Sequence, residues 1–159
     1  MRIGIDGREL LGERSVVGRY LSELLSQWIV CPHASEHEFL IYTPEQDSSL
    51  LGQDLPGRFD STSQLQYISV PGISGTYWEQ VQLRTVANSD RLDIFFAPAY
   101  SFPLAFQIPT VLTMHDVSFF AHTEWFSWRE GYRRRWLAQA SLRRARELNA
   151  VSQFTKDDH

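Results

Sequence analysis

Short apolar runs alternate with amphipathic segments along this chain, and the alternation limits its fold more than any other feature. Between Val17 and Trp28, apolar residues recur at helical spacing with polar residues opposite, and Pro32 follows; this predicts an amphipathic helix that ends before the proline. Further helices are expected at 77–89 and 124–147. Strands are expected at 2–6, 38–42, 65–70, 94–97, 111–114 and 148–151. Such an order predicts an α/β fold, a Rossmann-like and mostly parallel sheet with helices on both faces.

The composition is that of an ordinary soluble domain. The 159 residues are 43% hydrophobic and 21% charged, enough for one sizeable core. No apolar run approaches the roughly 18 residues of a membrane span, and residues 1–6 lack a secretory pattern. The single cysteine, Cys31, excludes an internal disulfide and fits a reducing compartment. We therefore expect one domain over residues 1–159, located in the cytoplasm, with a long polar loop at 47–63.

The phosphate-binding and hydrolase motifs of other α/β families are missing. Gly7, Gly12 and Gly18 do not have the G-x-G-x-x-G spacing of a dinucleotide-binding loop. The sequence also contains no P-loop and no G-x-S-x-G elbow. One cysteine cannot form a zinc finger, and the expected strand after His33 and His37 argues against a metal site there. We therefore expect neither a metal nor an organic cofactor.

An ionisable pair, His115-Asp116, follows the strand expected at 111–114. In open α/β sheets, ligands bind outside the carboxyl ends of the parallel strands. The pair is therefore a candidate catalytic site, in which His115 acts as a base or a hydrogen-bond donor. A histidine at a strand end can equally be a structural residue.

Seven of the fifteen basic residues fall within 129–146, although the whole chain carries a net charge of −4. Such a basic island indicates a contact with phosphates. The alternative is a solvated helix face whose arginines pair with Glu130 and Glu147. The acidic remainder of the chain counts against a nucleic-acid partner. The candidate contacts are Arg133, Arg134 and Arg135.

Six short motifs follow one another along the chain. They read GIDGR at 4–8, VGRYLSEL at 17–24, YWEQ at 77–80, DIFFAPAY at 93–100, TMHDV at 113–117 and VSQFT at 151–155. Together, in this order, they resemble the N-terminal domain of GT-B-fold glycosyltransferases of family 4, also called group 1. The resemblance covers nearly the whole chain.

The resemblance implies a retaining glycosyltransferase made of two Rossmann-like domains that face each other across a cleft. This chain would be the acceptor-side half, and a C-terminal domain outside it would bind the nucleotide sugar. The chain stops soon after Ser152, where a new helix would begin, so we expect it to be part of a longer protein. The isolated chain should then be inactive, because both domains stabilise the transition state. The alternative is a non-catalytic Rossmann-like ligand-binding or regulatory module.

The resemblance also implies roles for single residues. His115 corresponds to the family's cleft histidine near the reacting centre, and Asp116 is expected to orient its loop. Val17 and Gly18 correspond to the loop whose glycine amides approach the donor diphosphate. Val16 stands where the family usually has a glycine, and a β-branched side chain there resists positive φ.

The expected substrates are a nucleotide-sugar donor and a saccharide or lipid-linked saccharide acceptor. Trp78, Tyr100 and Phe102 lie near strand ends and could stack on sugar faces, although core packing explains them as well. Family members that glycosylate lipids often place a basic helix against anionic membrane. The arginine-rich segment therefore suggests a peripheral position at the inner face of the membrane.

Overall fold

The computed structural model of the chain describes residues 1–11, 15–44, 65–115 and 128–150, with only the backbone at 128 and 150. The polar loop predicted at 47–63, Asp116 and Ser152 lie outside these residues. Among the helices described, none is long and apolar enough to cross a membrane.

Six strands form one sheet in which every neighbouring pair is parallel. The strand order is β3-β2-β1-β4-β5-β6, so the chain reverses its direction of progress across the sheet between β1 and β4. That reversal is a topological switch point. The strands are β1 (Arg2–Asp6), β2 (Glu38–Pro44), β3 (Leu65–Val70), β4 (Ile94–Ala97), β5 (Thr110–Met114) and β6 (Glu147–Ala150).

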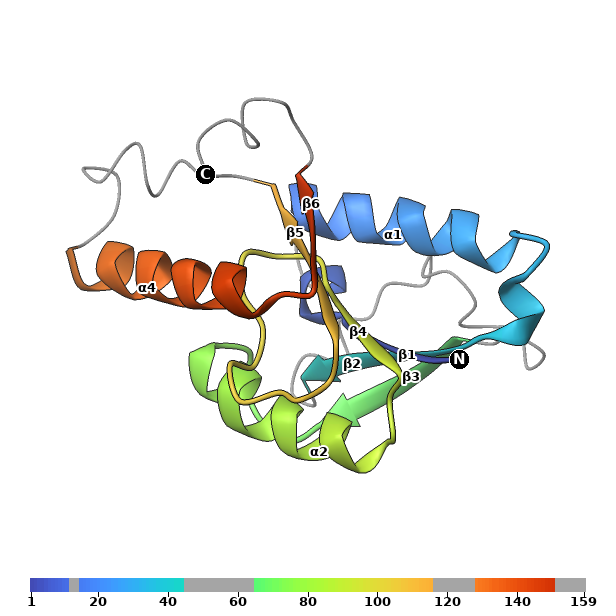
Figure 1. Cartoon of the computed structure of the whole chain (residues 1–159), viewed down its shortest axis with the longest axis horizontal. Helices are drawn as coiled ribbons and strands as arrows, with labels where there is room; N and C mark the ends of the chain where they lie inside the picture. The colour runs from blue at the N-terminus through green and yellow to red at the C-terminus, as the bar shows by residue number, and fades with distance from the viewer. Residues whose placement is uncertain (12–14, 45–64, 116–127, 151–159) are drawn as a thin grey trace.

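Helices cover both faces of the sheet, as the sequence predicts. Figure 1 shows α1 (Val16–Ile29) on one side of the strands, and α2 (Arg84–Ser89) and α4 (Trp128–Arg144) on the other. A π-helical segment, η4 (Trp78–Leu83), leads directly into α2. Two short 3-10 turns are also present. The first, η1 (Arg8–Leu10), follows β1, and the second, η2 (Ala34–Glu36), precedes β2. The predicted α/β class with a parallel sheet is confirmed.

The core consists of two apolar layers, one on each face of the sheet. Strand β2 contributes to both because successive side chains point to opposite faces. Phe39 and Ile41 pack with Leu21 and Leu25 of α1. The other layer lies under η4, α2 and α4 and includes Leu40, Tyr42, Trp78, Leu83, Phe95, Leu112, Met114 and Ala138. A strand buried on both faces reads as a continuous apolar run, which is why the sequence locates the strands well.

Candidate functional site

Three loops meet at the switch point because the carboxyl ends of parallel strands lie on the same edge of a sheet. The first follows β1 and contains Arg8 and Glu9, the second follows β4 at 98–101, and His115 follows β5 directly. This edge is where ligands bind in open α/β sheets. It therefore holds the candidate site.

His115 is half-buried at this edge. One ring nitrogen donates a hydrogen bond to the backbone carbonyl of Pro98, and the ring of Tyr20 lies edge-on to the imidazole with the centroids 4.5 Å apart. Nε2 is buried and has no hydrogen-bond partner among the described residues, so Nδ1 is the donor to Pro98. Burial lowers the pKa of His115, and this outweighs the opposing effects of Pro98 and the Glu9 carboxylate. The ring is therefore neutral at pH 7, and Nε2 carries a lone pair.

Two buried carboxylates share one arginine of the loop after β1. Asp6 is 2% exposed and Glu79 1% exposed. The Arg8 Nη2 atom lies 2.9 Å from Asp6 Oδ2 and also contacts Glu79 Oε2. The hydroxyl of Ser101 donates to the same Glu79 oxygen at 2.8 Å, so the network joins the loops after β1 and β4 to η4.

Burial and the neighbouring charges shift the pKa values of Asp6 and Arg8 to different extents. Burial raises the pKa of Asp6 to about 6 despite the attraction of Arg8. Asp6 Oδ1 accepts a hydrogen bond from the Arg8 backbone amide at 3.2 Å. Oδ2 receives none within the described part of the chain, although it lies 2.9 Å from Arg8 Nη2. Burial lowers the pKa of Arg8, but Asp6 and Glu79 raise it more, so the guanidinium stays charged.

Sequence reasoning did not identify this network. Both carboxylates fall inside motifs that carry the family resemblance, GIDGR and YWEQ, but neither was predicted as a site residue. The signal that could have identified these two residues is an acidic side chain at the edge of an apolar segment. Asp6 ends an apolar strand and Glu79 follows the buried Trp78, and buried carboxylates need charged or hydrogen-bonding partners.

A hollow of about 190 Å³ opens beside the network. Tyr100, Ser101 and Thr76 line it together with two arginines of α4. The Arg133 guanidinium donates to the Thr76 hydroxyl at 2.7 Å and so joins α4 to the loop after β3. The Arg134 guanidinium lies 5.8 Å from the centre of the Tyr100 ring. The hollow thus presents hydroxyls, charges of both signs and one aromatic ring.

Two of the three predicted aromatic contacts are wrong. Trp78 is fully buried and Phe102 is 2% exposed, so neither ring can stack on a sugar. Trp78 packs in the core beneath the Arg8 guanidinium, which is the core-packing alternative. Tyr100 is half-buried and lines the hollow, and its contact with an acceptor stays a prediction.

The structure gives Gly18 a packing role at the start of α1. Its amide donates to the Ser15 hydroxyl at 2.9 Å, which is an N-cap, and a Cβ at Gly18 would lie 2.1 Å from the Glu9 carbonyl oxygen. Val16 is 80% exposed and belongs to the helix. The Gly18 amide is therefore already occupied. Contact between Val17, Gly18 and a diphosphate stays a prediction.

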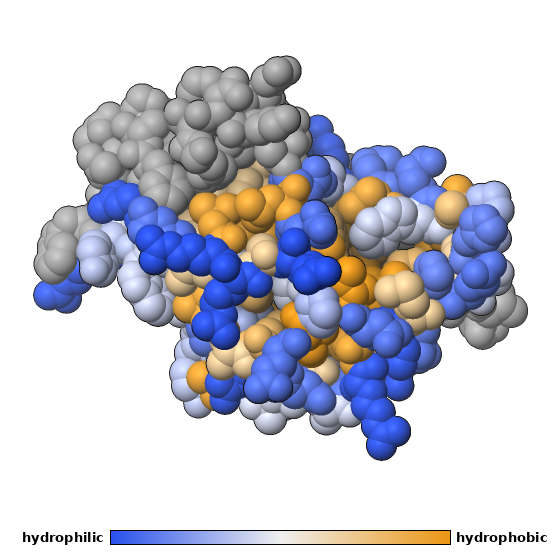
Figure 2. Space-filling model, viewed as in Figure 1, coloured by the Kyte–Doolittle hydropathy of each residue, from blue (hydrophilic) through white to orange (hydrophobic). Residues whose placement is uncertain are grey.

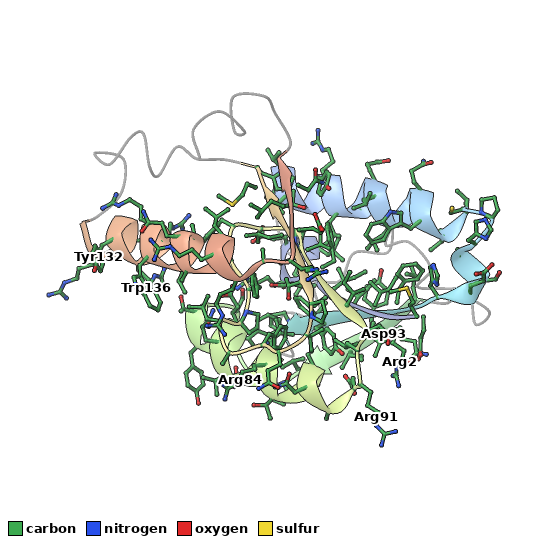
Figure 3. All side chains as sticks on the ribbon, in the orientation of Figure 1. Arg2, Arg84, Arg91, Asp93, Tyr132 and Trp136 are labelled. Carbon is green, nitrogen blue, oxygen red and sulfur yellow. The ribbon has the colours of Figure 1, made fainter. Side chains whose placement is uncertain are left out.

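The arginine island is partly paired along its own helix. Arg134 donates to Glu130 through Nε at 3.0 Å and Nη2 at 2.7 Å, as the solvated-face alternative expects. Hydrophilic residues gather over α4 in Figure 2. Tyr132 and Trp136 nevertheless project from α4 into solvent, as Figure 3 shows, at 64% and 53% exposure. Leu137 is the neighbour that turns into the core.

The family of the chain follows from a comparison with known sequences. Residues 17–159 match the sequence model of Glycosyltransferase Family 4. The chain belongs to this family. A comparison with curated proteins finds no match. The family match includes η4, His115 and α4, and the predicted membership is confirmed. Within the described residues, no three His, Cys, Asp or Glu side chains are grouped to hold a metal ion.

Proposed function

We propose that this chain is the acceptor-side domain of a retaining glycosyltransferase. The enzyme transfers a sugar from a nucleotide sugar to a saccharide or lipid-linked saccharide. The observation that supports this most is the state of His115, a neutral imidazole at the ligand-binding edge. Its Nδ1 is held by Pro98, and its Nε2 lacks a partner among the residues described.

In this proposal His115 contacts the donor sugar near the reacting carbon. Nε2 accepts a hydrogen bond from a sugar hydroxyl, and the bond from Nδ1 to Pro98 fixes the ring orientation. A hydrogen bond that strengthens as positive charge develops on the sugar lowers the barrier, because it acts in the transition state more than in the ground state. Asp116 then orients the loop that carries His115.

We further propose that the hollow beside Tyr100 binds the acceptor. Its charges are mixed, and the guanidiniums have carboxylate neighbours, so a phosphate would meet repulsion as well as attraction. A neutral polyol suits such a lining better, because each hydroxyl both donates and accepts. The Tyr100 ring adds an apolar surface. The charged groups of the hollow and its rim are Arg8, Arg133, Arg134, Glu9, Glu79 and Glu130.

A second domain would supply the other half of the site. It would bind the nucleotide and stabilise the charge that develops on the leaving diphosphate. Cleft closure would bring that charge to His115 and exclude water. The 159-residue chain alone should therefore not turn over, and neither a metal nor an organic cofactor is needed in this proposal.

The test is a glycosyltransfer assay of the full-length protein over a panel of nucleotide sugars. The His115→Ala variant should lose transfer, or donor hydrolysis, by on the order of 100-fold. His33→Ala is the matched control, because His33 is exposed in the loop between α1 and β2. Equal loss in both variants, or none in His115→Ala, contradicts the role of His115. If no nucleotide sugar binds or reacts, the ligand-binding module takes the place of the transferase.

A second proposal concerns the exposed side of α4. Tyr132 and Trp136 lie one helical turn apart and stand beside Arg133 and Arg135, a combination suited to the interface of an anionic membrane. The protein should co-sediment with vesicles that contain anionic lipid and not with neutral ones. Replacing both aromatic residues with serine should abolish the binding that survives high salt. Unchanged co-sedimentation of that variant excludes this side of α4 as the contact.

A further inference from the structure

Glu79 occupies an unusual position for an acidic side chain. It lies in the π-helical segment η4, directly after the fully buried Trp78, and is itself 1% exposed. Its Oε2 atom receives both the Arg8 guanidinium and the Ser101 hydroxyl, and its Oε1 atom receives the Gln80 side-chain amide. A buried charge with this many partners holds several chain segments in fixed positions.

The two main partners of Glu79 lie on the two loops that each also carry a residue interacting with His115. Arg8 precedes Glu9, whose carboxylate acts on the charge of His115 and accepts a hydrogen bond from Ser15. Ser101 lies three residues beyond Pro98, whose carbonyl holds the imidazole. One carboxylate on η4 therefore links the loop after β1 to the loop after β4.

The neighbouring residue strengthens the second link. The Gln80 amide donates to the Phe102 carbonyl at 3.0 Å, and its oxygen accepts from the Leu104 amide at 2.9 Å. Two consecutive side chains of η4 thus fix the loop after β4 at three points along 101–104. The position of the Pro98 carbonyl depends on that loop.

We propose that Glu79 is a positioning residue for His115, which it holds through Arg8 on one loop and Ser101 on the other. The proposal rests on the proposed function only for its consequence in catalysis. Its structural part concerns the orientation and burial of the imidazole, which can be measured without any substrate.

The direction in which the pKa of His115 changes in Glu79→Gln distinguishes a positioning role from a purely electrostatic effect of the Glu79 charge. His115 has a lowered pKa chiefly because it is buried. If Glu79 holds the loops, Glu79→Gln lets water reach the ring, and the pKa of His115 rises toward its ordinary 6.5. If Glu79 acts only as a distant negative charge, removing that charge lowers the pKa further. Glu9 and Tyr20, which face the ring, are unchanged in this variant.

The experiment is an NMR titration of the His115 Cε1–H signal, assigned by comparison with His115→Ala. The pKa of His115 should rise in Glu79→Gln, and it should stay unchanged in the control Glu23→Gln, which alters an exposed acid on α1. Ser101→Ala removes only one link and should give a smaller rise. Because this milder variant keeps the buried ion pair, it tests the proposal even if Glu79→Gln unfolds. An unchanged or lowered pKa in the folded variants overturns the positioning role.

Catalysis gives an independent readout in the full-length protein. Glu79→Gln should lower kcat on the order of tenfold and leave KM for the donor within about twofold, because orientation is lost while binding surfaces remain. Glu79→Asp, which keeps the charge, should recover part of kcat. If no sugar is transferred by the unaltered protein, the proposed function fails, and the NMR result still decides whether Glu79 positions His115.

Discussion

Asp6 should destabilise the fold as the pH rises, and Asp6→Asn isolates that effect. The carboxylate is 2% exposed at the end of β1, and burial raises its pKa from 3.8 to about 6. Arg8 opposes the shift without cancelling it. Asparagine has nearly the same shape and does not titrate, so the difference between the two proteins reports the protonation of Asp6.

The sign follows from which state binds the proton more tightly. The folded protein holds the Asp6 proton up to about pH 6, whereas the unfolded chain releases it near 3.8. The stabilising contribution of the protonated carboxyl is therefore complete below pH 3.8 and is lost as the pH rises to 6. A shift of about two units corresponds to about 3 kcal/mol, of which roughly 2 kcal/mol falls between pH 4.5 and 7.5.

The assay is urea unfolding of both proteins at several pH values across this range. The free energy of unfolding of the unaltered protein, minus that of Asp6→Asn, should fall by about 2 kcal/mol from pH 4.5 to 7.5. The control is Glu23→Gln, an exposed acid, for which the difference should stay flat within a few tenths of a kcal/mol.

The opposite slope would refute the reasoning. If the difference grows with pH, the attraction of Arg8 exceeds the cost of burial, and the pKa of Asp6 is lowered in the folded protein. A flat difference would mean that the two effects cancel. Either result would contradict the statement that burial destabilises the charged form of Asp6 in the folded protein.

Three smaller predictions concern the start of α1 and the core. Gly18→Ala should cost about 2 kcal/mol or more in chemical unfolding, because the new methyl would overlap the backbone carbonyl of Glu9; a neutral effect would show that this turn yields easily. Ser15→Ala should cost about 1 kcal/mol through loss of the helix cap, and Ser15→Thr should recover most of it. Trp78→Phe should lower the thermal midpoint, since it leaves a void in the core and the Val70 carbonyl without its indole donor; an unchanged midpoint would place the indole outside the packed core.

The sheet could be predicted closely because its strands carry the signal themselves. β1, β3 and β4 have the predicted bounds, and the predicted β2 is extended only to Pro44. The helix predicted at 77–89 is present, but its first half is π-helical. That local geometry places Trp78 inside and Tyr77 at 69% exposure. The apolar spacing of this segment predicts that Trp78 is buried, which is confirmed, but it does not predict the π-helical geometry.

The site could be predicted only in part, for a related reason. His115 was found because it directly follows a strand in an α/β fold, which is a local pattern. Of the two carboxylates that contact Arg8, Asp6 is a near neighbour in the sequence, but Glu79 is 71 residues away. No spacing in the sequence encodes that contact, because it depends on how η4 packs against the end of β1. The predicted roles of Trp78 and Phe102 failed since a position near a strand end does not fix the direction of a side chain.

A contribution to stability does not explain why the protein has a buried network of charged residues at the switch point. Replacing a buried ion pair with apolar residues is often neutral or stabilising, and the positions around Asp6 offer an apolar setting, with Ile5 in the core on one side of the chain. Asp6 remains charged at pH 7 at an energetic cost, on the edge where His115 lies. Residues that destabilise the fold in this way are found mainly at functional sites. If this holds here, Asp6→Asn should gain stability relative to the unaltered protein as the pH rises while losing transfer activity, and a variant that gains both would show that the charge has no part in the site.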